Sequence, residues 1–178
     1  MSIIAGPVNM AVSLEDARNS ARRNGTDSDA EIEVQVRAFT GEAEHETGRS
    51  IIHRTHRVTL DRFNGAIRLP APPVASVTVV KYFDVDGAEQ ELDPDDYLVD
   101  RESEPGYIVP APGRAWPATQ ERINAVTVEL ICGYGPDHTT TPPEVKGFIL
   151  AKVREYFAPA GTPESPHLGR LLDGLKVY

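Results

Sequence analysis

Few side chains in this sequence have the spacing that metal binding requires. Glu42 and His45 form one Glu-x-x-His pattern, but di-iron bundles use two such patterns plus two further glutamates from four helices. Only one copy is present, so a solvated acidic helix face is the better interpretation. His53 and His56 lie three apart on an expected strand, where residues at that spacing point to opposite faces. We therefore expect no metal site in either segment.

Residues 84–87, Asp-Val-Asp-Gly, resemble the start of a calcium-binding loop. Such a loop needs glycine at its sixth position and glutamate at its twelfth. Gly87 falls at the fourth position, and Asp95 occupies the twelfth. A hairpin turn accounts for these residues without a cation, and Asp93, Asp95 and Asp96 are expected to form a second turn.

A catalytic nucleophile needs a base and an orienting acid. The sequence has no Gly-x-Ser-x-Gly pattern, and Gly133-Tyr134-Gly135 is neither a phosphate-binding loop nor a dinucleotide fingerprint. The one cysteine, Cys132, lies in an apolar strand and is expected to be a buried structural thiol. No catalytic residue, cofactor site or metal site is predicted, and the chain is expected not to be an enzyme.

The composition is that of a soluble globular protein with a formal net charge of −9 over 178 residues. This charge argues against a nucleic-acid-binding protein, because phosphate contacts need clustered Lys and Arg. The same negative charge would suit a surface that DNA must pass without binding. A mild basic stripe around the first expected strands favours a solvated or partner-facing surface over nucleic-acid binding: Arg49, Arg54, Arg57, Arg62 and Arg68.

One cysteine allows no disulfide within the chain and no cysteine-based zinc site, which fits a reduced, cytoplasmic setting. No stretch approaches the roughly 20 apolar residues that span a bilayer, and the first residues do not form a signal peptide. No membrane association is expected.

Two helices are expected near the start, after an extended arm over residues 1–12. Ser13 and Asp16 resemble a capping box at the start of the first helix, which Asn24-Gly25 would end. Residues 27–47 fit both a strand and a helix period. Acidic residues at the start, good helix formers on the polar face and Gly48 at the end favour the helix.

An antiparallel sheet is expected over residues 51–134. Its strands are predicted at 51–60, 66–69, 74–83, 89–92, 97–100, 107–109 and 125–131. A third helix over 142–158 is expected to be capped by Thr141, and Pro159 would end it.

The order of these elements predicts an α+β fold. A bundle of about three helices carries an antiparallel sheet inserted between the second and third helices, with extended N- and C-terminal arms. Residues 1–158 are expected to form a single domain, made of helices at 13–48, the insertion at 51–134 and a helix at 142–158. Residues 159–178 are expected to be a linker and an arm.

Several phrases spread over residues 12–158 resemble the head–tail connector proteins of tailed bacteriophages, also called adaptor or head-completion proteins. The first is VSLEDAR, followed by a helix that ends in Thr47-Gly48-Arg49. The second is RVTLDRF with IRLPAPPVASVTVVKYFDVDGAEQELDPDDYLVD. The third is Ala115-Trp116-Pro117 with AVTVELICGYGPD, and the last is TPPEVKGFILAKVREYF. Gene transfer agents, which are domesticated phage particles, use the same component.

The resemblance implies a structural virion protein without catalytic activity. Such subunits form a ring, usually of twelve copies, that joins the portal to a stopper or tail-completion protein in the neck and lets DNA pass without specific binding. Assembly in the bacterial host cytoplasm is implied. The central sheet and its loops are expected to contact ring neighbours.

The C-terminal arm is the expected portal anchor, because an apolar segment follows a Pro/Gly linker there. Its anchoring side chains would be Leu168, Leu171, Leu172, Leu175, Val177 and Tyr178. Folding of this arm onto its own core is the alternative. For the whole chain, the alternatives are another neck component, such as a stopper, and a small hydrolase or metal-binding enzyme with an unrecognised site.

Overall fold

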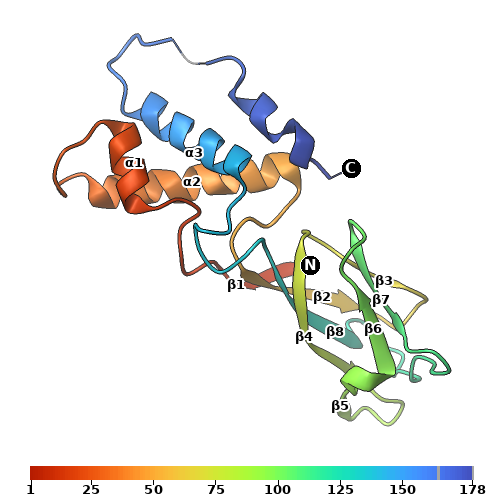
Figure 1. Cartoon of the computed structure of the whole chain (residues 1–178). Helices are drawn as coiled ribbons and strands as arrows, with labels where there is room; N and C mark the ends of the chain where they lie inside the picture. The colour runs from red at the N-terminus through yellow and green to blue at the C-terminus, as the bar shows by residue number, and fades with distance from the viewer. Residues whose placement is uncertain (164, 178) are drawn as a thin grey trace. The chain divides into compact units, whose positions relative to one another are not determined.

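The structure, a computed structural model, describes residues 1–163 and 165–177. Within these residues it forms three α-helices, eight strands and two 3-10 helices (Figure 1). In chain order these are β1 (Ser2–Ala5), α1 (Leu14–Ala21), α2 (Asp29–Thr47), β2 (Arg54–Leu60), β3 (Ile67–Leu69), β4 (Val74–Phe83), β5 (Glu89–Glu91), η1 (Pro94–Asp96), β6 (Tyr97–Asp100), β7 (Gly106–Pro110), β8 (Val126–Cys132), α3 (Pro143–Tyr156) and η2 (Leu168–Leu175). None of the described helices is long and apolar enough to cross a membrane.

The predicted α+β fold, with an antiparallel sheet inserted between α2 and α3, is confirmed. The chain forms two compact units. The sheet unit comprises Met1–Gly6 and Arg54–Gly133, and the helical unit comprises Pro7–His53 and the chain from Tyr134 onward. Each unit has its own apolar core. The boundary predicted at residue 158 stays a prediction.

The first helix begins as predicted. The Ser13 hydroxyl oxygen accepts a hydrogen bond from the Asp16 N–H at 3.0 Å, and the hydroxyl donates to the Asp16 carboxylate at 2.7 Å. This pairing satisfies a backbone donor that the first turn leaves free. The helix ends at Ala21, earlier than the predicted stop at Asn24-Gly25, because Arg22 adopts a left-handed backbone (φ 53°).

The ambiguous segment after α1 is helical, as predicted. Its buried side chains recur every three or four residues, which is the helix period: Ile32, Val36, Thr40, Ala43 and Thr47. Gly48 ends the helix with φ 69°, and its N–H donates to the Glu44 carbonyl at 2.9 Å. Glycine adopts this left-handed conformation without steric cost.

The predicted Thr141 cap of α3 is wrong. Pro142 occupies the capping position with ψ 141°, and α3 begins at Pro143. A residue that precedes a proline is disfavoured in the helical region, so Pro142 stays extended. The Thr141 hydroxyl is buried and has no hydrogen-bond partner in the described part of the chain.

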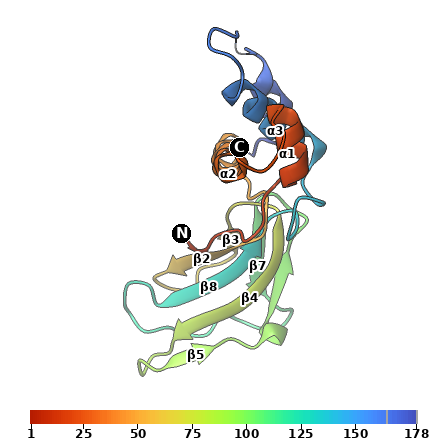
Figure 2. The ribbon, with the colours of Figure 1, turned by 90° about the vertical axis from the view of Figure 1, so that its left-hand side faces the viewer.

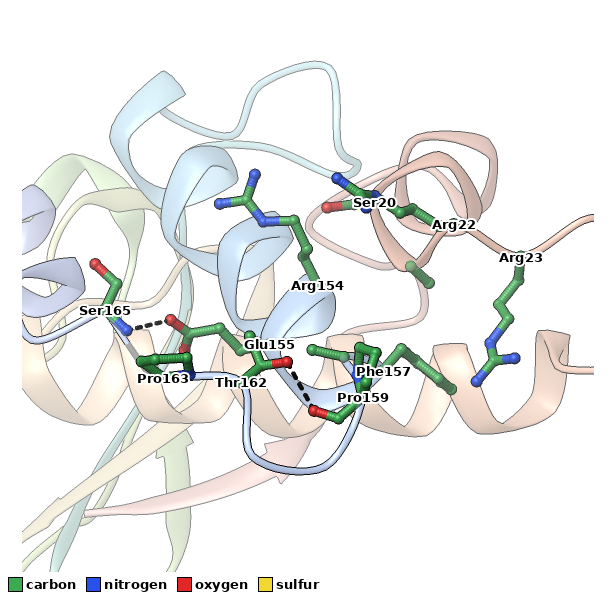
Figure 3. Close-up of a pocket in the computed structure, with 12 residues that line it drawn as sticks. Ser20, Arg22, Arg23, Arg154, Glu155, Phe157, Pro159, Thr162, Pro163 and Ser165 are labelled. Atoms are coloured by element: carbon green, nitrogen blue, oxygen red, sulfur yellow. Dashed lines mark hydrogen bonds between the residues drawn. The ribbon is translucent and has the colours of Figure 1, made fainter.

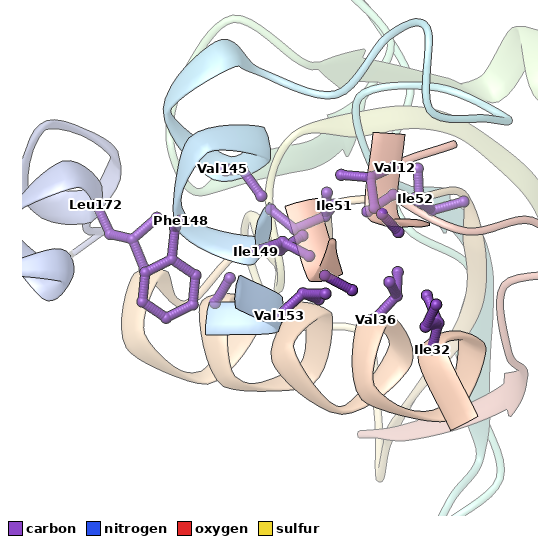
Figure 4. Close-up of a cluster of buried hydrophobic side chains, with 14 residues drawn as sticks. Val12, Ile32, Val36, Ile51, Ile52, Val145, Phe148, Ile149, Val153 and Leu172 are labelled. Atoms are coloured by element: carbon purple, nitrogen blue, oxygen red, sulfur yellow. The ribbon is translucent and has the colours of Figure 1, made fainter. Parts of the chain in front are cut away.

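The core of the helical unit joins α2, α3 and two distant segments (Figure 4). Val145, Phe148, Ile149 and Val153 point from α3 towards α2. Ile51 and Ile52, which follow α2, complete the packing from the chain that leads to β2. Burial of each such side chain stabilises the fold by about 1.5–3 kcal/mol.

The C-terminal segment, expected as an extended arm, is instead folded onto the helical unit. Residues Leu168–Leu175 form η2, and Leu172 is fully buried in the core beside Phe148 (Figure 4). The Arg49 guanidinium donates to the Leu175 carbonyl. Burial of Leu172 and these backbone contacts hold the segment in place.

The sheet unit holds two antiparallel sheets, one of five strands in the order β1-β2-β8-β4-β5 and one of three in the order β3-β7-β6. Figure 2 shows β2, β8, β4 and β5 side by side. Central β8 buries alternate residues, Val126, Val128, Leu130 and Cys132, as expected for a strand with one covered face. The expected N-terminal arm is extended, and it pairs with β2 as edge strand β1.

Candidate functional site

In the Glu42-x-x-His45 pattern, the glutamate is held in an ion pair and the histidine is exposed. The Glu42 carboxylate accepts from the Lys152 ammonium at 2.7 Å, and this ion pair links α2 to α3. His45 is exposed on the outside of α2. Within residues 1–163 and 165–177, no group of three or more His, Cys, Asp or Glu side chains is arranged to hold a metal ion.

The Asp84 segment is a hairpin turn between β4 and β5, as predicted. The Asp84 carboxylate accepts from the N–H groups of Asp86 at 3.0 Å and Ala88 at 2.9 Å, and from the Gln90 amide at 2.7 Å. The Gln90 bond, followed by the Ala88 bond, holds the pKa of Asp84 below its usual value. The carboxylate thus stabilises the turn itself.

Burial shifts the pKa values of His56 and Cys132 in opposite directions. Burial lowers the pKa of His56, and the charge of Arg54 lowers it further, so both favour the neutral imidazole. Burial raises the pKa of Cys132 to about 12. A thiol with such a pKa stays protonated at neutral pH, and the thiolate is the nucleophilic form. Both side chains pack inside the sheet unit.

A cleft of about 840 Å³ lies in the helical unit, between the end of α1, the end of α3 and the loop that follows α3 (Figure 3). Arg22 and Arg23, which directly follow α1, and Arg154 of α3 line this cleft. The Arg23 guanidinium lies 5.2 Å from the centre of the Phe157 ring. In the described part of the chain, no carboxylate forms an ion pair with these three arginines.

The other polar side chains of the cleft serve the fold. The Ser20 hydroxyl donates to the Leu150 carbonyl at 2.6 Å, and Glu155 accepts from the Ser165 N–H at 2.7 Å. The cleft therefore offers positive charge to a ligand, such as an acidic segment of another protein.

The residues predicted to bind a portal lie in different environments. Leu172 is fully buried, and Leu168 and Leu175 are partly buried against the same core. Leu171 is 42% exposed and lies near Gly147 of α3. Val177 is half-buried, and Tyr178 lies outside the described residues. Leu171 is thus the most exposed leucine of this set.

A second set of exposed apolar residues was missed in the choice of site residues. Met1, Ile3 and Ile4 of the sheet unit all expose 41% or more of their surface. The signal was present in the uncharged stretch 1–12, which was predicted to be an arm and given no binding residues. Exposed apolar clusters of this kind mark protein contacts.

Comparison with known proteins identifies solved structures that have the same fold. No protein-family model matches the chain, and no curated protein matches it. Among the solved structures that match, three share the fold over 99% of the chain. One is the neck of an empty GTA particle computed with C6 symmetry, at 17% identity, with a TM-score of 0.76 and 95% of that chain covered.

The second is the virion of a native gene transfer agent (GTA) particle, at 19% identity, with a TM-score of 0.77 and 95% of that chain covered. The third is the neck of a native GTA particle computed with C12 symmetry, at 20% identity, with a TM-score of 0.72 and 96% covered. The resemblance predicted from the sequence phrases is confirmed at the level of the fold. The chain has the fold of a protein found in gene transfer agent particles.

Proposed function

We propose that this chain is a structural neck protein, an adaptor subunit whose ring joins the portal to the stopper or tail-completion protein. The observation that carries the proposal is the likeness of fold over 99% of the chain to proteins in GTA necks. The order of the sequence phrases, from VSLEDAR to the α3 segment, points to the same component. A location in the virion neck follows, after assembly in the host cytoplasm.

The ring is proposed to have twelve copies. The C12 and C6 symmetries used for the related necks support this number. Twelve copies at −9 each give a total charge on the order of −100. Such a ring repels the DNA backbone and lets DNA pass without specific binding.

The C-terminal segment is proposed to face the portal, with Leu168, Leu171, Leu172, Leu175, Val177 and Tyr178 as its apolar residues. Because Leu172 lies in the helical core, two modes of portal binding differ in their free-energy cost. Docking of the folded η2 through Leu171 keeps the core intact. Release of the segment would expose Leu172 and lose about 2–3 kcal/mol of burial. We therefore assign the first contact to Leu171.

Portal binding is the direct test of this function. Purified portal should retain the wild-type chain, and Leu171→Asp should weaken this retention while the fold stays intact. Val34→Asp, at an exposed valine on α2, is the matched control. A chain that fails to bind portal, and binds a preformed adaptor ring instead, would be a stopper.

A further inference from the structure

The five-stranded sheet exposes apolar side chains at one edge, on β1. All four residues of β1 are exposed. Ile3 and Ile4 are 52% and 41% exposed, and a register shift interrupts the pairing of β1 with β2 between Ile3 and Ala5. Both residues are therefore accessible to a partner. We call Met1, Ile3 and Ile4 the N-terminal edge.

A second exposed apolar pair lies at the end of β4, beside the turn that leads to the opposite edge strand, β5. Val85 in the turn and Ile123 in the loop before β8 are 64% and 76% exposed. The loop is fixed to the end of β4, because the Phe83 N–H donates to the Ala125 carbonyl at 2.9 Å. The Arg122 guanidinium also lies 4.0 Å from the centre of the Phe83 ring. Val85 and Ile123 thus lie at the same end of β4.

The charges of the two edges differ. Strand β5 has the sequence Glu-Gln-Glu, and all three residues are exposed. Residues 1–12 carry no charged side chain, and Arg57, which pairs with Ser2 in the sheet register, is held in an ion pair with Glu129 at 2.6 Å. We call Val85, Ile123, Glu89 and Glu91 the hairpin edge. Two hairpin edges placed together would repel, whereas a hairpin edge and an N-terminal edge would not.

We propose that the N-terminal edge of one copy binds the hairpin edge of the next copy. A ring needs such a head-to-tail contact, in which each copy contributes two different surfaces. The two edges lie on opposite sides of one rigid sheet, so each copy can bind two neighbours at once. This inference rests on the proposed function and names the surfaces that form its ring.

The contact is assigned to the exposed apolar side chains, with Ile3 and Ile4 of one copy packed against Val85 and Ile123 of the next.

Two variants test the two surfaces separately. Ile3→Asp with Ile4→Asp breaks the N-terminal edge, and Val85→Asp with Ile123→Asp breaks the hairpin edge. Val34→Asp, in the helical unit, is the control. Sedimentation velocity and native mass spectrometry at rising protein concentration should show rings for the wild type and for the control. Each edge variant alone should stay monomeric, with an unchanged circular dichroism spectrum.

An equimolar mixture of the two edge variants is the decisive measurement. One variant keeps an intact hairpin edge and the other an intact N-terminal edge, so one contact can form and the mixture should give dimers that contain one of each. The inference is overturned if either variant forms rings, if the mixture stays monomeric, or if the wild type itself does not associate. If the hairpin-edge variant forms dimers by itself, its intact N-terminal edge must bind the N-terminal edge of a second copy.

Portal binding separates failure of this inference from failure of the proposed function. Wild-type rings that bind portal, with edge variants that also form rings, would leave the neck function standing and assign the ring contact elsewhere. A wild type that forms rings but is not retained by portal or by an adaptor ring would contradict the neck function and leave the edge contact standing.

Discussion

The N–H of Val177 donates a hydrogen bond to the carbonyl of Thr47 at 2.9 Å. This bond ties the end of the described chain to the last turn of α2, about 130 residues earlier in the sequence. Together with the buried side chain of Leu172, it makes the C-terminal segment a part of the helical unit. A segment that looks dispensable in the sequence therefore contributes to stability.

Leu172→Ala should destabilise the protein by about 2–5 kcal/mol, because it leaves a cavity in a fully packed core. Urea denaturation followed by circular dichroism measures this as a lower midpoint. Leu171→Ala is the matched control, and at 42% exposure it should cost about 1 kcal/mol or less. Equal, small effects at both positions would mean that η2 does not pack as described.

The ion pair between Arg18 and Asp29 should make stability depend on pH. Its hydrogen bonds join α1 to the first turn of α2 and lower the pKa of Asp29 from the usual 3.8. A carboxyl group with a lowered folded-state pKa stabilises the fold fully above its unfolded value. That contribution is lost as the pH falls through the folded-state pKa.

Asp29→Asn removes this contribution. The melting temperature of the variant should be lower than that of the wild type at neutral pH, and the difference should shrink progressively as the pH falls below about 4. Asp27→Asn, at an exposed carboxyl group near the same helix start, should behave like the wild type. A difference between Asp29→Asn and the wild type that stays constant with pH would contradict the assigned ion pair.

The sequence predicted most elements because their signals are local. For α2, the acidic residues at its start and Gly48 at its end favoured the helix period over the strand period. Strand β4 was predicted with its observed bounds. The Thr141 cap was wrong because the conformation of Pro142 depends on its own following proline. That effect is also local, and it was open to prediction from the Pro-Pro pair.

The roles of the two termini were not predictable from local signals. Both ends of the chain contain exposed and apolar residues, and apolar character alone does not say what covers a side chain. Leu172 is buried because η2 lies against α2 and α3, which are far away in the sequence. Ile3 and Ile4 are exposed because β1 lies at the edge of its sheet, and the edge position follows from the strand order.

Cys132 should not react with thiol reagents while the protein is folded. Its side chain is fully buried and its pKa is raised to about 12, so thiolate is scarce at neutral pH. A colourimetric thiol assay should show slow reaction in buffer and fast, stoichiometric reaction in urea. Val34→Cys places a second thiol at an exposed position and should add one fast-reacting group to the folded protein.

Two glycines should respond to alanine in opposite ways. At Gly106, at the start of β7, an added Cβ would lie 2.6 Å from the carbonyl oxygen of Asp100. That oxygen belongs to the backbone of β6, which pairs with β7, so the strands must separate locally. Gly106→Ala should therefore cost about 1–3 kcal/mol or more, the range seen when a packed site is overfilled.

Gly41 lies inside α2, and an added Cβ there meets nothing within 4 Å outside the helix's own backbone. Alanine is the better helix former by about 1 kcal/mol, since glycine loses more backbone freedom on folding. Gly41→Ala should therefore raise the midpoint of urea denaturation, while Gly106→Ala lowers it. A loss of stability in Gly41→Ala would require a neighbour at that position, and the surface of α2 around Gly41 would then have to be buried in an assembly that persists in solution.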